Sequence, residues 1–215
     1  MIVIIDYGMG NLRSAQKGFE KAGHDAVISS DPAAIGSAKG VVLPGVGAFA
    51  DCFDGLRDRG FVEPVLGWIE GGNPLLGICV GMQLLFEYGE EGRGSPGLGV
   101  FGGRVVRFPD PATTGLKVPH MGWNKLEPVP ENNNTILANL GSESYVYFVH
   151  SYHAAVADAG IVSAYTTYGV SFPAVVGRDN VFATQFHPEK SQQVGIGILK
   201  AFGDFVKKQA RPALV

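Results

Sequence analysis

Residues 74–82 read Pro-Leu-Leu-Gly-Ile-Cys-Val-Gly-Met, an apolar run that passes into the pattern Gly-x-Cys-x-Gly. A buried strand that ends in this pattern and continues as a helix is typical of a nucleophile elbow, here with a thiol in place of a hydroxyl. The two glycines let strand and helix approach closely around a strained residue. We expect Cys79 to be exposed at this turn, near a helix N-terminus that favours its thiolate, and the N–H of Val80 to face a developing oxyanion. A lone cysteine is often a small buried apolar residue, but the flanking glycines favour the nucleophile.

The rest of the N-terminal half alternates short apolar runs with amphipathic segments. The apolar runs are residues 2–5, 26–29, 41–43 and 74–78; helical patterns cover residues 12–22, the surroundings of Phe53 and Trp68, and a helix that starts within 82–88. Runs that are apolar on both faces indicate a buried parallel sheet covered by helices.

The C-terminal half is rich in β-branched and aromatic residues, which favour strands, some of them antiparallel. The expected strands are residues 100–108, 144–149, 161–167, 174–177 and 181–186, and the expected loops are 110–115 and 128–134. Residues 193–208 should form a helix, with an apolar stripe through Ile196, Leu199, Phe202 and Val206. The sequence therefore predicts an α/β fold. We expect one domain over residues 1–215, with a central, mostly parallel twisted sheet flanked by helices and antiparallel strands in the C-terminal half.

Composition excludes several classes of protein. Hydrophobic residues make up 46% of the chain and charged residues 17%, as in ordinary globular proteins. The formal net charge is −3 and no Lys/Arg cluster is present, so we expect neither nucleic acid nor a membrane as a partner. The start of the chain does not resemble a signal peptide, which predicts a cytoplasmic location. The two cysteines, Cys52 and Cys79, have no metal-ligand spacing, so we expect no metal and no cofactor.

His187-Pro188-Glu189 follows the expected strand 181–186. Pro188 should stop both helix and sheet pairing, which leaves His187 and Glu189 on the same side. A carboxylate beside an imidazole fixes its tautomer and stabilises the imidazolium that forms when a thiol loses its proton. Alone, this tripeptide would be an exposed turn. Together with the cysteine elbow it predicts a triad of Cys79, His187 and Glu189.

A second glycine loop, Pro44-Gly45-Val46-Gly47, follows the strand 41–43 and could supply a further N–H to the oxyanion, or be a plain turn between strand and helix. The expected oxyanion donors are therefore Val80 and the backbone of Gly45, Val46 and Gly47.

Other residues invite a functional interpretation less strongly. Gly8-Met9-Gly10 follows the first strand as in a dinucleotide-binding loop, but Arg13 stands where the third glycine belongs, which argues against NAD. We expect Cys52 to be a packing residue that can be replaced without loss of activity. We expect His24 to be on the surface, and the remaining histidines to be structural: His120, His150 and His153.

These motifs resemble the class I glutamine amidotransferases, whose Gly-x-Cys-x-Gly elbow and His-Pro-Glu triad match residues 77–81 and 187–189. Within that family, four further segments resemble the glutaminase subunits of imidazole glycerol phosphate synthases: residues 6–12, 44–49, 81–86 and 119–124. The resemblance covers nearly the whole chain. Val80 stands where the family often has leucine, which leaves the backbone donor unchanged.

The resemblance implies a glutaminase that splits glutamine into glutamate and ammonia. It implies that Gln83, Ser151 and Tyr152 hold the glutamine. A second group would face a partner near the ammonia exit: Tyr147, Lys190, Pro119, Met121 and Trp123. The implied partner is a (β/α)8 cyclase subunit, which forms a heterodimer with the glutaminase. It uses the ammonia to make imidazole glycerol phosphate and the aminoimidazole carboxamide ribonucleotide, a step of histidine biosynthesis.

Three alternatives remain open on sequence alone. The glutaminase of pyridoxal phosphate synthase shares the elbow and the His-x-Glu pattern, although residues 6–12 and 119–124 speak against it. A noncatalytic binding module could keep the fold and use Cys79 as a redox sensor. A cysteine peptidase for γ-glutamyl peptides would need an open groove.

Overall fold

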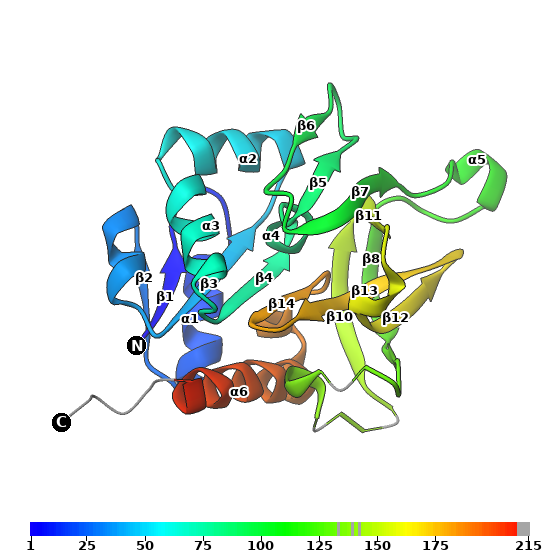
Figure 1. Ribbon diagram of the computed structural model, residues 1–215. Coiled ribbons are helices and arrows are strands. Elements are labelled where there is room, and N and C mark those ends of the chain that lie inside the picture. Colours follow the sequence, from blue (N-terminus) through cyan, green and yellow to red (C-terminus); the bar gives the residue numbers. More distant parts are fainter. Residues whose placement is uncertain (133, 139, 142, 210–215) are drawn as a thin grey trace.

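A large mixed sheet runs through the centre of the protein (Figure 1). The computed structural model describes residues 1–209 apart from 133, 139 and 142. The strands of this sheet are β1 (Ile2–Ile5), β2 (Ala26–Ser29), β3 (Gly40–Gly45), β4 (Leu75–Cys79), β9 (Glu127–Pro128), β12 (Val162–Tyr168), β13 (Val170–Arg178) and β14 (Val181–Thr184). Their order is β2-β1-β3-β4-β14-β13-β12-β9; neighbours are parallel from β2 to β14 and antiparallel from β14 to β9. The predicted α/β fold is confirmed.

Helices cover both faces of this sheet. They are α1 (Leu12–Lys21), α2 (Phe49–Asp58), α3 (Val62–Glu70) and α6 (Gln192–Gln209), with 3-10 turns η1 (Pro32–Ser37), η2 (Thr135–Leu137), η3 (Ala159–Ile161) and η4 (Pro188–Lys190). α1 and α6 pack together on one face, and α2 and α3 lie on the other (Figure 1). The predicted stripe on α6 is confirmed, because Leu199, Phe202 and Val206 are buried at helical spacing.

Two smaller sheets extend the C-terminal half (Figure 1). The four-stranded one, in the order β11-β7-β5-β6, contains β5 (Phe86–Gly89), β6 (Ser95–Pro96), β7 (Phe101–Arg107) and β11 (Tyr152–Val156). The other is an antiparallel ribbon of β8 (His120–Lys125) and β10 (Tyr145–His150). The sequence predicted β7 and β10 but neither β8 nor β11.

The helix predicted within 82–88 is wrong. α4 (Val80–Gln83) is a single turn, and the chain is a strand again from Phe86. The carbonyls that a longer helix would use are taken by distant N–H groups: Leu98 donates to Leu84 at 2.7 Å and Phe101 donates to Leu85 at 2.9 Å. Long-range pairing therefore overrides a local apolar pattern that fits a helix.

Of the two predicted loops, 110–115 differs from the structure, whereas 128–134 is a loop in its described residues apart from Pro128. Residues 110–115 contain a helical turn, α5 (Pro111–Thr114), because Asp110 accepts from the N–H of Ala112 and Pro111 occupies the first helical position. The expected loop 128–134 begins inside β9, and its residue 133 lies outside the described residues. The strand expected over 181–186 ends at Thr184.

His24 is buried, at 5% exposure, and not on the surface as predicted. A Cβ at Gly203 of α6 would overlap its ring, so a glycine on that helix makes room for it. Nε2 of His24 lies 3.3 Å from the carboxylate of Asp204 on the same helix. The histidine therefore packs against α6.

The buried apolar residues form one cluster that draws on both halves of the chain. One domain over residues 1–215 remains a prediction, and residues 210–215 lie outside the described part. Among the described residues no helix is long and apolar enough to cross a membrane.

Candidate active site

The elbow predicted at Cys79 is present between β4 and α4. Cys79 has φ 56°, a conformation that residues with a side chain rarely adopt. Both flanking glycines are required because the backbone approaches closely at each of them. A Cβ at Gly77 would lie 2.9 Å from the carbonyl oxygen of Gly81, and a Cβ at Gly81 would overlap the carbonyl oxygen of Leu43 on β3. The predicted strained turn with close strand and helix packing is confirmed.

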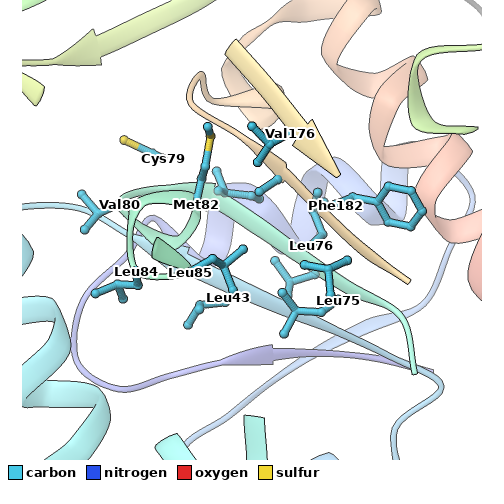
Figure 2. Packing of buried hydrophobic residues seen from close by; sticks show 14 of the residues in the cluster. Leu43, Leu75, Leu76, Cys79, Val80, Met82, Leu84, Leu85, Val176 and Phe182 are labelled. Carbon is cyan, nitrogen blue, oxygen red and sulfur yellow. The ribbon is translucent and has the colours of Figure 1, made fainter. Parts of the chain in front are cut away.

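Cys79 is only 3% exposed, so the expectation of an exposed thiol is wrong. In Figure 2 its side chain points away from Leu43, Leu84 and Leu85, which pack on the other side of the elbow. Cys79 instead lines a cavity of about 300 Å³. Its thiol is reached through this cavity and not from the general surface.

The cavity gathers most of the residues expected to bind or hydrolyse glutamine. It is lined by Val46, Gly47, Cys79, Val80, Gln83, Glu91, Pro119, Val149, His150, Ser151, Tyr152 and His187. Gly45 is not among the lining residues, and Pro119, expected at a partner surface, is. A volume of this size is at the lower end of small-molecule sites, as a ligand the size of an amino acid requires.

His187 and Glu189 form the pair that the sequence predicted. Nδ1 of His187 lies 2.8 Å from Oε1 of Glu189, and both side chains are 2% exposed. Nε2 of His187 is buried and has no hydrogen-bond partner among the described residues, so it is available to a reacting group in the cavity. Burial opposes a charge on the ring, but Cys79 and Glu189 beside it raise the pKa of His187 to about 10. An imidazolium beside a thiol is the arrangement in which cysteines react as thiolates.

The prediction that Pro188 stops helical structure is wrong, because Pro188 occupies the first position of η4.

Ser191, which the sequence analysis missed, connects this turn to β10 by hydrogen bonds. Its hydroxyl donates to the carbonyl of His187 at 2.7 Å and accepts from the N–H of Tyr147 at 3.0 Å, while the N–H of His187 donates to the carbonyl of Tyr147 at 3.1 Å. The position of His187 is thus fixed by the backbone of β10.

Gln83 is held by two partners that are distant in sequence. Its amide donates to the carbonyl of Tyr152 at 3.0 Å and to the side chain of Gln185 at 3.1 Å. The amide nitrogen of Gln185 lies 3.9 Å from Sγ of Cys79. The sequence analysis missed Gln185, which follows the end of β14 at Thr184 and lies two residues before His187.

Glu91 was also missed. Its carboxylate lines the cavity and accepts from the N–H of Phe49, at the first turn of α2, at 2.7 Å. No sequence signal singles it out, because the contact joins residues 42 positions apart.

The family model for class-I glutamine amidotransferases matches residues 3–203. The chain belongs to this family. It is 58% identical over 210 residues to imidazole glycerol phosphate synthase subunit HisH of Syntrophotalea carbinolica, covering 95% of this chain and 100% of that one. It is 53% identical over 206 residues to the protein of the same name from Geobacter sulfurreducens, covering 94% and 98%.

Solved structures share the fold of this amidotransferase. One described as a glutamine amidotransferase has a TM-score of 0.72 at 22% identity, covering 94% of this chain and 100% of that one. A putative GMP synthase protein from Thermoplasma acidophilum has a TM-score of 0.69 at 23% identity, covering 96% and 94%. The class I amidotransferase fold predicted from the sequence is therefore confirmed.

A buried histidine pair borders the cavity of the amidotransferase. Nδ1 of His150 lies 2.8 Å from the carbonyl of Tyr152, which can only accept, so this nitrogen carries a proton. Nε2 of His150 then accepts from Nδ1 of His120 at 3.0 Å. A proton added to Nε2 of His150 would face the N–H of His120, and one added to Nε2 of His120 would face the amide nitrogen of Asn124, 3.5 Å away, so the bonded pair is neutral. The structural role predicted for His120 and His150 fits this arrangement.

This pair should make folding sensitive to acid. Burial lowers the pKa of His120 to about 4 and that of His150 to about 3. Their stabilising effect is present above the unfolded pKa of about 6.5 and is lost as pH falls from there toward the folded values. Between pH 7.5 and 5.5 we expect each histidine to lower the free energy of unfolding by about 1.4 kcal/mol. Urea unfolding at pH 7.5 and 5.5 measures this loss of unfolding free energy. The loss should be smaller in His120→Gln than in the parent by about that amount, and an equal loss in both proteins would contradict the assignment.

The residues expected to face a partner gather around the β8–β10 ribbon. Met121 and Trp123 on β8 are 62% and 47% exposed, large values for apolar side chains. Trp123 pairs with Tyr147 across the ribbon, with ring centroids 6.1 Å apart, and Nζ of Lys190 lies 5.9 Å from the Tyr147 ring. These side chains come from β8, β10 and η4, and one of them, Tyr147, lies on β10, the strand whose backbone holds His187.

Proposed function

We propose that this amidotransferase is the glutaminase subunit of an imidazole glycerol phosphate synthase and supplies ammonia for histidine biosynthesis. The observation that carries the proposal is the full-length similarity, at 58% and 53% identity, to two proteins that bear this name. Cys79 and His187 in one cavity supply the chemistry that such a glutaminase needs. The relatives favour this assignment over the glutaminase of pyridoxal phosphate synthase.

The reaction begins with attack of the Cys79 sulfur on the side-chain amide carbon of glutamine. The oxyanion that forms is stabilised by the N–H of Val80 and by residues 44–47, called the 44–47 loop below. They comprise the last two residues of β3, which extends beyond the predicted strand 41–43, and the two residues that follow it. His187, charged at neutral pH because its pKa is about 10, gives a proton to the leaving nitrogen. The C–N bond breaks, ammonia departs, and a glutamyl thioester remains on Cys79.

Hydrolysis of the thioester completes the cycle. The neutral His187 takes a proton from water, the hydroxide attacks the thioester carbon, and glutamate leaves as the sulfur is released. Glu189 holds Nδ1–H of His187 at 2.8 Å and stabilises its positive charge throughout.

The cavity also fits the two charged groups of glutamine. Glu91 provides a carboxylate that suits the α-ammonium group, and the segment Ser151–Tyr152 provides further polar groups in the lining of the cavity. Gln83 is fixed by Tyr152 and by Gln185, whose amide lies beside Cys79, and suits the side-chain end of the substrate.

A cyclase subunit is the proposed partner and receiver of the ammonia, in a heterodimer located in the cytoplasm. The exposed group of Met121, Trp123, Tyr147 and Lys190 suits its docking surface, since apolar aromatic patches of this kind are typical of interfaces. Pro119 lines the cavity beside this group and suits the ammonia exit.

Glutamate release from glutamine tests the assignment. We expect the cyclase subunit with its nucleotide ligand to raise the rate at least about fivefold over the isolated chain, because a coupling free energy between sites is typically about 1–3 kcal/mol. Full activity in the isolated chain, or no activity in either case, would contradict it. Equal turnover of γ-glutamyl dipeptides would favour a peptidase instead.

A further inference from the structure

Two buried side chains that do not line the cavity donate hydrogen bonds to the 44–47 loop. The hydroxyl of Tyr7 donates to the carbonyl of Pro44 at 2.6 Å, and the thiol of Cys52 donates to the carbonyl of Val46 at 3.3 Å. Tyr7 is 1% exposed and Cys52 is not exposed at all. Tyr7 follows β1 and Cys52 lies on α2, so two separate elements hold the same loop.

Both groups keep the proton that they donate. Burial raises the pKa of Tyr7 well above its ordinary value, and burial raises the pKa of Cys52 to about 11. Neither side chain therefore ionises near neutral pH. The packing role predicted for Cys52 is confirmed by its burial. Its thiol also has a specific acceptor in the loop, so the proposal below departs from the expectation that Cys52 can be replaced without loss of activity.

These bonds orient two peptides of the loop. The C=O and N–H of a trans peptide point in opposite directions. A Val46 carbonyl that faces Cys52 therefore leaves the N–H of Gly47 pointing away from α2, and both Val46 and Gly47 line the cavity beside Cys79. The Tyr7 bond fixes the peptide between Pro44 and Gly45, two peptides earlier, in the same way.

Gly45 joins this arrangement to the elbow. A Cβ at Gly45 would lie 2.9 Å from the Tyr7 hydroxyl, 2.9 Å from Cβ of Val80 and 2.7 Å from the N atom of Gly81. The tyrosine hydroxyl, the loop and the elbow are thus in direct packing contact. A shift of the loop at Pro44 changes its distance from the atoms that react at Cys79.

We propose that Tyr7 and Cys52 are positioning residues that orient the 44–47 loop for stabilisation of the oxyanion. The inference rests on the proposed glutaminase function. It gives the segment Asp6-Tyr7-Gly8 a role that dinucleotide binding does not supply. Since the oxyanion exists only on the reaction path, loss of either donor lowers kcat and leaves KM nearly unchanged.

The test uses the complex with the cyclase subunit and its nucleotide ligand. Tyr7→Phe removes only the hydroxyl, and we expect kcat for glutamate release to fall about tenfold, less than the 10²–10³ lost with a whole oxyanion donor, with KM within about twofold. Cys52→Ala should lower kcat about threefold, because a thiol is a weaker donor than the tyrosine hydroxyl. Cys52→Ser, which keeps a donor at this position, should retain most of the parent kcat. The matched control is Tyr168→Phe, whose hydroxyl donates to the backbone carbonyl of Lys117 at 2.8 Å on an exposed part of the chain.

A second readout separates positioning from damage to the elbow. Iodoacetamide alkylates a reactive thiolate without an oxyanion intermediate, so its rate at Cys79, followed by mass spectrometry, should stay within about twofold in Tyr7→Phe. An unchanged kcat would overturn the inference. The inference would also be overturned if the rate of Cys79 alkylation in Tyr7→Phe fell in parallel with kcat. An equal fall of kcat in the control Tyr168→Phe would overturn it as well. A parent complex that does not hydrolyse glutamine would instead overturn the proposed function, and this inference with it.

Discussion

Cys79→Ala should lower glutamine-dependent glutamate release by at least about 10³-fold, because loss of a nucleophile removes the covalent route altogether. The variant should remain folded. Alanine fills less of the cavity than cysteine and leaves both flanking glycines and their backbone contacts unchanged. Thermal unfolding of parent and variant checks this directly.

The complex with the cyclase subunit provides the control. If Cys79 acts only in ammonia release, the variant complex should still form product when ammonium salt replaces glutamine.

Glu189→Gln should lower glutamate release less than Cys79→Ala does, by about 10–10²-fold. The amide oxygen still accepts from Nδ1–H of His187 but no longer balances its charge. A folded Cys79→Ala protein with glutaminase activity would exclude the mechanism.

Gly81→Ala should have the largest effect on stability. Its Cβ would overlap the carbonyl oxygen of Leu43 and lie 2.8 Å from the Leu43 carbonyl carbon, both backbone atoms of a buried strand. Neither β3 nor α4 can yield without breaking the sheet or the elbow. We expect a loss of more than about 4 kcal/mol in the free energy of unfolding, or failure to fold.

Gly67→Ala is the matched control for this substitution. Gly67 lies within α3 and a Cβ there would meet no atom within 4 Å. Alanine is the better helix former, so we expect a gain of up to about 1 kcal/mol. Urea unfolding followed by circular dichroism measures both variants. A Gly81→Ala protein as stable as the parent would show that the elbow does not need its close backbone approach.

The β8–β10 ribbon connects the proposed partner surface with the site. Tyr147 contributes its ring to the exposed aromatic group and its backbone to the hydrogen bonds that fix His187 and Ser191. A partner that docks on Trp123 and Tyr147 therefore contacts the strand that positions the base. In the proposed complex, docking and catalysis would share this ribbon.

The sequence alone was sufficient for features that depend on neighbouring residues. Glycines on either side of Cys79 predicted the strained elbow, and the two-residue spacing of His187 and Glu189 predicted their hydrogen bond. The periodicity of residues 193–208 predicted α6, and apolar runs predicted the parallel strands β1 to β4. Each of these follows from backbone geometry over a few residues.

Tertiary structure alone decided whatever depends on which distant segments meet. The end of α4 is set by N–H groups of Leu98 and Phe101, and the burial of His24 by a glycine on α6. Gln185 reaches Gln83 across 102 positions, and Tyr7 reaches Pro44 across 37. A buried polar group must find a partner, but local sequence does not say which one, because the partner is chosen by the register and packing of elements far apart in the chain.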